Sequence, residues 1–266
     1  MDSAEDGSAA VRGDRVRTGL RARRVGRRWL AAALAVAMGS LAAAQEVPAQ
    51  QPGPVVVELY TSQGCSACPP ADELLTELAE RDDVIALALH VDYWNYLGWA
   101  DTLSAPGHAK RQKLLASAMG ERMIYTPQAV IDGVRGVVGS DREAVEAAIA
   151  EARARDDARP VTVTMTQEGD LIRARAQASR PVTAMLIYMV YDHPVDVAIG
   201  AGENGGMTVT YVNAVRALMP MGRWTGAQGA WSLPAPQDAR GAALLLQEPG
   251  GRIIGAARIE FETATD

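Results

Sequence analysis

The chain has 266 residues, of which 48% are hydrophobic and 22% are charged. This composition is ordinary for a globular protein and excludes a wholly disordered or collagen-like chain. The formal net charge is −6 although eight arginines lie within the first 28 residues, so the remainder is more acidic still, and we expect neither nucleic acid nor an anionic membrane surface as a partner.

The first 44 residues have the order of a secretory signal peptide. Arginines precede a short apolar run, Trp29–Leu41, and Ala42–Ala44 supplies the small residues of a cleavage site. The run is Ala-rich and shorter than a membrane span needs, so an uncleaved anchor is the alternative rather than the expectation. We expect residues 1–44 to be removed, residues 45–53 to form a linker, and the mature chain to be periplasmic or secreted with no membrane span. Disulfides persist in such an oxidising compartment.

Residues 54–155 alternate strand and helix patterns. Val55–Tyr60 and Val84–Leu89 are apolar runs typical of buried strands, and leucines at helical spacing predict a helix between them. Two strands joined by a helix form a parallel pair. Asp132-Gly133 predicts a hairpin between two further strands.

Cys65 and Cys68 are the only cysteines, and they lie where the first strand meets the first helix. A Cys-x-x-Cys at this position is typical of a redox dithiol, because a helix start offers unpaired N–H groups and a positive dipole end that favour a thiolate. We expect Cys65 to be the more exposed sulfur and the nucleophile, and Cys68 to resolve the mixed disulfide. Because Cys68 precedes Pro69, we also expect it to leave helical backbone angles.

Two other uses of the cysteines remain open. A structural disulfide is typical of exported proteins, although so short a loop contributes little through chain entropy. A metal site needs about four ligands, and the three histidines, His90, His108 and His193, lack metal-ligand spacing. We expect no metal and no other cofactor.

Thr126 and Pro127 precede the third strand. If that strand runs antiparallel to the first two, its start lies at the edge where they end, so both residues face Cys65. We expect Pro127 to be cis and in contact with the dithiol, and the backbone of Thr126 to pair with an extended client. A trans loop proline is the alternative.

Four aromatic residues gather in the loop after the second strand. They are Tyr93, Trp94, Tyr96 and Trp99. They form either an apolar surface for a client polypeptide or a cover over the end of the sheet. His90 and Asp92 either move protons to and from the dithiol or serve a structural role.

Residues 160–266 show strand patterns with almost no helical periodicity. Several short strand patterns punctuated by turns predict a β-sandwich. Glu203-Asn204 lies in a Gly-rich segment that is either a turn between strands or a contact site.

Residues 54–155 resemble a thioredoxin-like domain through the Cys-x-x-Cys and the Thr-Pro before a strand. More narrowly, the chain resembles the bacterial family called domain of unknown function 1223. The matching segments are Glu58–Cys65, Cys68–Asp72, His90–Trp94, Tyr125–Gln128, Gly202–Gly206 and Tyr211–Asn213. The resemblance implies a thioredoxin-like fold and export, with no established substrate. We therefore expect an α+β protein, with a thioredoxin-like domain followed by a β-sandwich domain.

The leading functional hypothesis is thiol–disulfide exchange on polypeptide cysteines, with clients or a redox partner protein as partners. Cys65 and Cys68 would be catalytic, and Thr126, Pro127, Tyr93 and Trp94 would bind the substrate. The alternatives are a non-catalytic envelope binding or assembly protein with a structural disulfide, and a metallochaperone.

Overall fold

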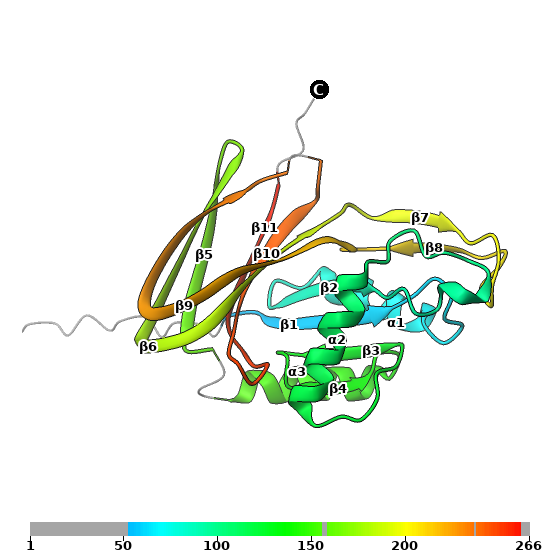
Figure 1. Cartoon of the computed structure of the whole chain (residues 1–266), viewed down its shortest axis with the longest axis horizontal. Helices are drawn as coiled ribbons and strands as arrows, with labels where there is room; N and C mark the ends of the chain where they lie inside the picture. The colour runs from blue at the N-terminus through cyan, green and yellow to red at the C-terminus, as the bar shows by residue number, and fades with distance from the viewer. Residues whose placement is uncertain (1–52, 156–158, 237, 262–266) are drawn as a thin grey trace, which may run out of the picture. The chain divides into compact units, whose positions relative to one another are not determined.

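The computed structural model describes residues 53–155, 159–236 and 238–261 (Figure 1). All of them lie in one compact unit, Ala49–Asp266. The predicted signal peptide, residues 1–44, lies outside the described residues, as does all but the last residue of the predicted linker. No helix within the described ranges is long and apolar enough to cross a membrane.

Four strands form a mixed sheet in the order β2-β1-β3-β4. They are β1 (Val55–Thr61), β2 (Val84–His90), β3 (Gln128–Ile131) and β4 (Arg135–Val138). Strand β1 runs parallel to β2 and antiparallel to β3, and β3 and β4 form the predicted hairpin. Every residue of β1 and β2 is buried, as continuous apolar runs predict. Tyr60 pairs with Gln128, so the end of β1 and the start of β3 lie at one edge of the sheet.

Helices α1 (Pro69–Ala79) and α3 (Arg142–Ala154) cover one face of this sheet. Leu74, Leu75 and Ile149 pack there against the inward side chains of β1 and β2. The short helix η1 (Asn95–Leu97) and helix α2 (Pro106–Met119) follow β2, and α2 buries apolar side chains on the opposite face. Successive strand residues point to opposite faces, so β1 contributes to both layers.

Five strands form a second, antiparallel sheet. They are β5 (Val161–Glu168), β6 (Leu171–Tyr191), β9 (Val215–Pro234), β10 (Gly241–Gln247) and β11 (Ile253–Glu260). Strands β6 and β9 have 21 and 20 residues and pair along nearly their whole length. Strands β5 and β10 pair with successive parts of the other edge of β6.

This second sheet curls strongly, as the arcs of β6 and β9 in Figure 1 show. Register shifts interrupt the β6–β9 ladder near Gly222 and Gly226, whose φ angles of +105° and +156° glycine adopts most readily. Such bulges bend strands. At Gly255 of β11, a Cβ would lie 2.6 Å from the carbonyl oxygen of Val161, so β11 approaches β5 closely.

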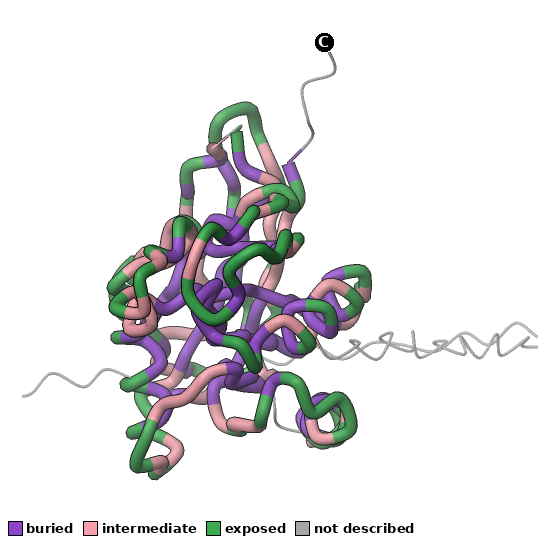
Figure 2. Tube along the Cα trace, turned by 90° about the vertical axis from the view of Figure 1, so that its right-hand side faces the viewer, coloured by how far each residue is buried: buried purple, intermediate pink, exposed green. Residues whose placement is uncertain are grey.

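The two sheets share a core. Val56 and Tyr60 of β1 and Leu87 of β2 belong to the same buried cluster as Met189 of β6 and Leu245 of β10. Figure 2 shows the buried residues running through the interior of the molecule, with exposed residues on the outer loops and helix faces. One face of the four-stranded sheet is therefore covered partly by another sheet.

A buried ion pair fixes α2 to both sheets. Arg111 donates to both carboxylate oxygens of Glu58, with Nη2 at 2.7 Å from Oε1. The hydroxyl of Tyr60 donates to Glu58 Oε2 at 3.1 Å, and Arg111 Nη1 donates to Gln247 Oε1 at 3.1 Å. Burial alone would lower the pKa of Arg111, but the Glu58 carboxylate raises it well above its usual value. We call these four residues the Glu58 cluster.

The predicted fold class, a thioredoxin-like domain followed by a β-sandwich in an α+β protein, is wrong. Strands make up 46% and helices 20% of the described structure, and the antiparallel sheets are curled. The physical reason is the length of β6 and β9, which form one bent sheet where several short strands predicted two stacked sheets. That sheet also packs on the four-stranded sheet. The division into domains 54–155 and 160–266 stays a prediction.

Candidate functional site

Cys65 and Cys68 are joined by a disulfide between the end of β1 and the start of α1, with Cα atoms 5.4 Å apart. Cys65 is 2% exposed and Cys68 is fully buried. The amide of Cys68 donates to the carbonyl of Cys65 at 3.1 Å, and the amide of Asp72 to the carbonyl of Cys68 at 3.1 Å. Cys68 has helical angles, φ −81° and ψ −36°, so the expectation that Pro69 displaces it is wrong; the first-turn prolines continue the helix that Cys68 begins.

Trp94 links the start of β3 to the segment between β1 and α1, residues 62–68, which we call the cysteine loop. Its Nε1 donates to Thr126 Oγ1 at 2.7 Å, and a Cβ at Gly64 would lie 3.2 Å from Trp94 Cβ. The Thr126–Pro127 bond is cis, as predicted. Pro127 also lies close to Ala71 in the first turn of α1, because a Cβ added at Gly139 would be 3.3 Å from the Cβ atoms of both residues. The structure thus brings Trp94, Thr126 and Pro127 to the end of the molecule that carries the disulfide.

Tyr93 points to α2 instead. Its hydroxyl donates to Gln112 Oε1 at 3.2 Å, and burial raises its pKa to about 12. Tyr93 therefore supports the loop, while Tyr96 is 78% exposed. Trp99 donates through Nε1 to Gln63 Oε1 at 2.8 Å, so the aromatic loop combines supporting and exposed side chains.

A second segment also contacts the cysteine loop. Strands β7 (Val195–Ala198) and β8 (Thr208–Tyr211) form a separate hairpin, and β8 contacts α1. In the connecting loop, residues 199–207, Asn204 Nδ2 donates to the carbonyls of Gln63 at 3.0 Å and of Cys65 at 2.9 Å. Glu203 Oε2 accepts from Ser66 Oγ at 2.7 Å and from the Ser66 amide at 3.4 Å.

Glu203 and Asn204 are therefore contact residues, one of the two interpretations that the sequence left open. The segment is indeed a Gly-rich connection between strands, with Gly202 and Gly206 at positive φ. Nothing in its local pattern indicates a contact with residues about 140 positions earlier. The only signal was that the family resemblance continued into Gly202–Gly206.

A buried polar cluster lies behind the disulfide. His90 Nδ1 and Asp101 Oδ2 are 2.9 Å apart, and Asp72 interacts electrostatically with both residues. Within the described part of the chain, Thr61 Oγ1, His90 Nε2 and both carboxylate oxygens of Asp72 have no hydrogen-bond partner. We call Thr61, Asp72, His90 and Asp101 the His90 cluster.

Two carboxyl groups of this cluster titrate differently. Burial raises the pKa of Asp72 to about 7, against the opposing effects of the His90 charge and of the Thr61 hydroxyl. Burial alone would raise the pKa of Asp101 as well, but its hydrogen bond with His90 and the backbone donors of Gln63 and Leu103 lower it. A carboxyl one helical turn from Cys68 thus changes protonation near neutral pH.

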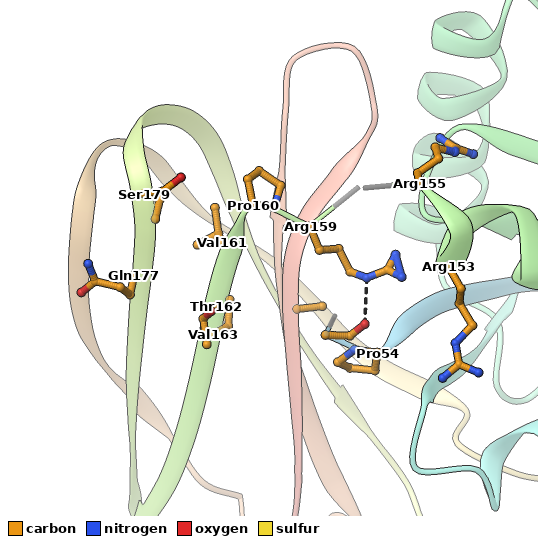
Figure 3. A pocket seen from close by; sticks show the side chains of 13 residues that line it. Pro54, Arg153, Arg155, Arg159, Pro160, Val161, Thr162, Val163, Gln177 and Ser179 are labelled. Carbon is orange, nitrogen blue, oxygen red and sulfur yellow. Dashed lines mark hydrogen bonds between the residues drawn. The ribbon is translucent and has the colours of Figure 1, made fainter. Parts of the chain in front are cut away.

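A cavity lies away from the disulfide. It has a volume of about 640 Å³ and lies among the starts of β1 and β5 and the end of α3 (Figure 3). Arg159 donates to Gly53 O at 2.8 Å and pairs with Asp132, while Arg153 pairs with Asp83. These arginines hold neighbouring segments together, and no residue of the cysteine loop lines the cavity. Among residues 53–155, 159–236 and 238–261, no group of three or more His, Cys, Asp or Glu side chains is arranged to hold a metal ion.

Comparison with known proteins gives a family without an activity. The family model described as "Protein of unknown function (DUF1223)" matches residues 56–247, and the chain belongs to this family. The crystal structure of protein AGR_C_4864 from Agrobacterium tumefaciens is similar, with 31% identity, a TM-score of 0.72, and coverage of 82% of this chain and 98% of that one. HBP35 of Porphyromonas gingivalis shares the fold at 15% identity and a TM-score of 0.54, covering 81% of this chain and 78% of its own. No curated protein matches.

Proposed function

We propose that the protein exchanges thiols and disulfides with polypeptide partners, in the periplasm or outside the cell, through Cys65 and Cys68. The observation that carries the proposal is the disulfide between the chain's two cysteines, placed where β1 meets the first turn of α1. The positive end of the α1 dipole favours a thiolate at this position, while Pro69 and Pro70 have no N–H and the amides of Ala71 and Asp72 donate to Cys68 O.

In the reduced protein, the thiolate of Cys65 attacks one sulfur of a partner disulfide. The Sγ–S bond of a mixed disulfide forms, and the partner's other sulfur leaves as a thiolate that takes up a proton. Cys68, deprotonated, then attacks Cys65 Sγ and releases the partner's remaining sulfur. The partner has gained two electrons, and the Cys65–Cys68 disulfide has re-formed. The reverse sequence oxidises a partner dithiol.

The start of β3 supports a polypeptide as substrate. Thr126 and Pro127 lie in the segment that Trp94 joins to the cysteine loop, and an extended client can pair with backbone of this kind. Pro127 and Thr126 would position the client, while Trp94 holds their segment beside the cysteine loop and Tyr93 supports Trp94's loop from α2.

One observation favours a second candidate, a binding or assembly protein in which the disulfide is structural. Cys65 and Cys68 are 2% and 0% exposed, whereas a reactive disulfide must be reached by another sulfur. The two candidates differ in what the thiols do after reduction, which a trapping experiment measures.

Reduced Cys68→Ser protein is mixed with a peptide that contains one disulfide. Cys65 attacks, and the adduct accumulates because no Cys68 thiol is present to release it. The matched control is reduced Cys65→Ser, whose only thiol is the buried Cys68. Non-reducing electrophoresis and mass spectrometry should show adduct with Cys68→Ser and far less with Cys65→Ser. Equal adducts, or none with either variant, would reject exchange and favour the structural disulfide.

A further inference from the structure

The cysteine loop is exposed only between its two cysteines. Ser66 and Ala67, between the two cysteines, are exposed, while Cys65 itself is 2% exposed. The 199–207 loop contacts the chain on both sides of Cys65, through Asn204 at the carbonyls of Gln63 and Cys65 and through Glu203 at Ser66. The 199–207 loop therefore lies against the backbone before and after Cys65.

Exchange requires Cys65 to be uncovered. The sulfur that attacks a disulfide approaches in line with the bond that breaks, from the side opposite the leaving sulfur, and it needs a free path. With Cys68 as the buried leaving sulfur, the approach is to Cys65. A disulfide with exposures of 2% and 0% offers no such path, so some part of the molecule must move.

We propose that the 199–207 loop is a latch that covers Cys65 and must open before a partner's sulfur reaches it. This inference rests on the proposed function and names the element that regulates it. The tip carries the contacts: the base of the hairpin is closed by the Ile199 amide donating to Met207 O at 2.9 Å and the Gly206 amide donating to Ile199 O at 2.8 Å. Opening the tip breaks the two hydrogen bonds of Asn204 and the contact of Glu203, and leaves the strands of the hairpin paired.

The glycines of the loop fit this role. Gly202 and Gly206 flank the contacting residues at φ +80° and +88°, a region in which glycine adds no steric penalty. Gly200 packs against Trp99, whose ring carbon would lie 2.8 Å from a Cβ there, and Trp99 in turn donates to Gln63. The 199–207 loop thus rests on Trp99, which is itself hydrogen-bonded to Gln63 of the cysteine loop.

The test measures how fast dithiothreitol reduces the disulfide in the full mature chain. A dithiothreitol thiolate attacks Cys65, Cys68 leaves as a thiolate, and the second dithiothreitol thiol closes a cyclic disulfide, so the pair gains two electrons and two protons. Asn204→Ala removes two buried hydrogen bonds and should speed reduction about tenfold. Glu203→Gln and Ser66→Ala weaken one exposed contact and should each speed it about twofold.

Thr210→Ala is the matched control. It removes a hydrogen bond of the same hairpin, from Thr210 Oγ1 to Asp196 Oδ1 at 2.6 Å, that does not touch the cysteine loop, so the reduction rate should stay at the wild-type value. Because Glu203 and Ser66 share one contact, the double variant Glu203→Gln/Ser66→Ala should be no faster than the faster single variant.

The latch is wrong if Glu203→Gln and Ser66→Ala are reduced at the wild-type rate and Asn204→Ala is faster only in proportion to its lost free energy of unfolding, measured in urea. Equal acceleration by Thr210→Ala would also overturn it, because general loosening of the hairpin would then explain the effect. These outcomes are separate from the trapping result: adducts with Cys68→Ser and unchanged reduction rates would keep the exchange and reject the latch.

Discussion

Two buried polar clusters border the same strand, and they differ in how they are satisfied. In the Glu58 cluster, both carboxylate oxygens of Glu58 accept hydrogen bonds from Arg111, and Tyr60 and Gln247 complete the network. In the His90 cluster, neither carboxylate oxygen of Asp72 nor His90 Nε2 has a hydrogen-bond partner of normal geometry within the described residues, although the nearby Thr61 hydroxyl lowers the pKa of Asp72. The first joins two sheets and a helix, and the second lies one helical turn from Cys68.

The difference shows that polar groups are buried here for two purposes. A fully paired cluster keeps its charges and fixes neighbouring elements, at the risk of a large loss when one partner is removed. A cluster with unpaired atoms stabilises little, and groups of this kind concentrate at sites that exchange protons or ligands. The predictions below test whether the two clusters respond in these different ways.

The largest effect is expected in the Glu58 cluster. Glu58→Gln leaves the buried guanidinium of Arg111 without a counter-charge and should lower the free energy of unfolding by about 3–5 kcal/mol. Urea unfolding with the disulfide intact measures this loss. Glu77→Gln, which breaks the exposed pair between Glu77 and Arg142, is the control and should change the stability by no measurable amount. Similar small effects in both variants would remove the contrast between buried and exposed pairs.

The pH dependence of stability should reveal the His90 cluster. The folded-state pKa of Asp72, raised to about 7 by burial, lies above its unfolded value near 4, so the folded state binds the extra proton. Its contribution is therefore present below about pH 4 and lost as pH rises through about 7. From pH 4 to pH 9 the free energy of unfolding should fall by roughly 2–4 kcal/mol.

Asp72→Asn should remove this fall, because the amide does not titrate. His90, Asp101 and Glu73, whose charges act on Asp72, remain in the variant, so the difference between the two unfolding curves isolates Asp72. Parallel curves for wild type and variant from pH 4 to pH 9 would show that Asp72 titrates normally and that the two clusters do not differ in this respect.

A smaller effect is expected at the hydrogen bond that joins Trp94 to the start of β3. Trp94→Phe removes the hydrogen bond to Thr126 and should lower the free energy of unfolding by about 1 kcal/mol. Thr126→Val removes the same bond from the other side, so the double variant should lose less than the sum of the single variants. Additive losses in thermal unfolding would mean that the bond does not link the aromatic loop to the start of β3.

The sequence predicted best where local pattern and burial agree. The apolar runs of β1 and β2 and the Asp132-Gly133 hairpin have local causes, and the structure confirms them. The cis bond before Pro127 was predicted from the expected antiparallel direction of β3, and the structure confirms it too. The position of the cysteines between a strand and a helix was predicted for the same reason.

The rest depends on contacts between distant parts of the chain. The sequence pattern hides strand β9, because Pro220, Gly222, Gly226 and Gly229 resemble turn residues. In the structure Gly222 and Gly226 lie near bulges where the strand bends along β6. The sandwich prediction failed with it. Asn204 was undecided because only the folded chain brings its side chain to the carbonyl of Cys65. The partner of Glu58 on a buried strand depends in the same way on the fold, because Arg111 of α2 lies 53 residues further along the chain.

The reduction potential of the Cys65–Cys68 pair tests the central proposal most directly. Structural disulfides lie below about −300 mV, while catalytic pairs range from about −270 to −120 mV. The full mature chain is equilibrated in glutathione and dithiothreitol buffers of defined potential, and the free thiols are counted by alkylation and mass spectrometry. The account predicts a potential within the catalytic range. A pair that stays oxidised at potentials below about −300 mV would contradict exchange and identify the disulfide as structural.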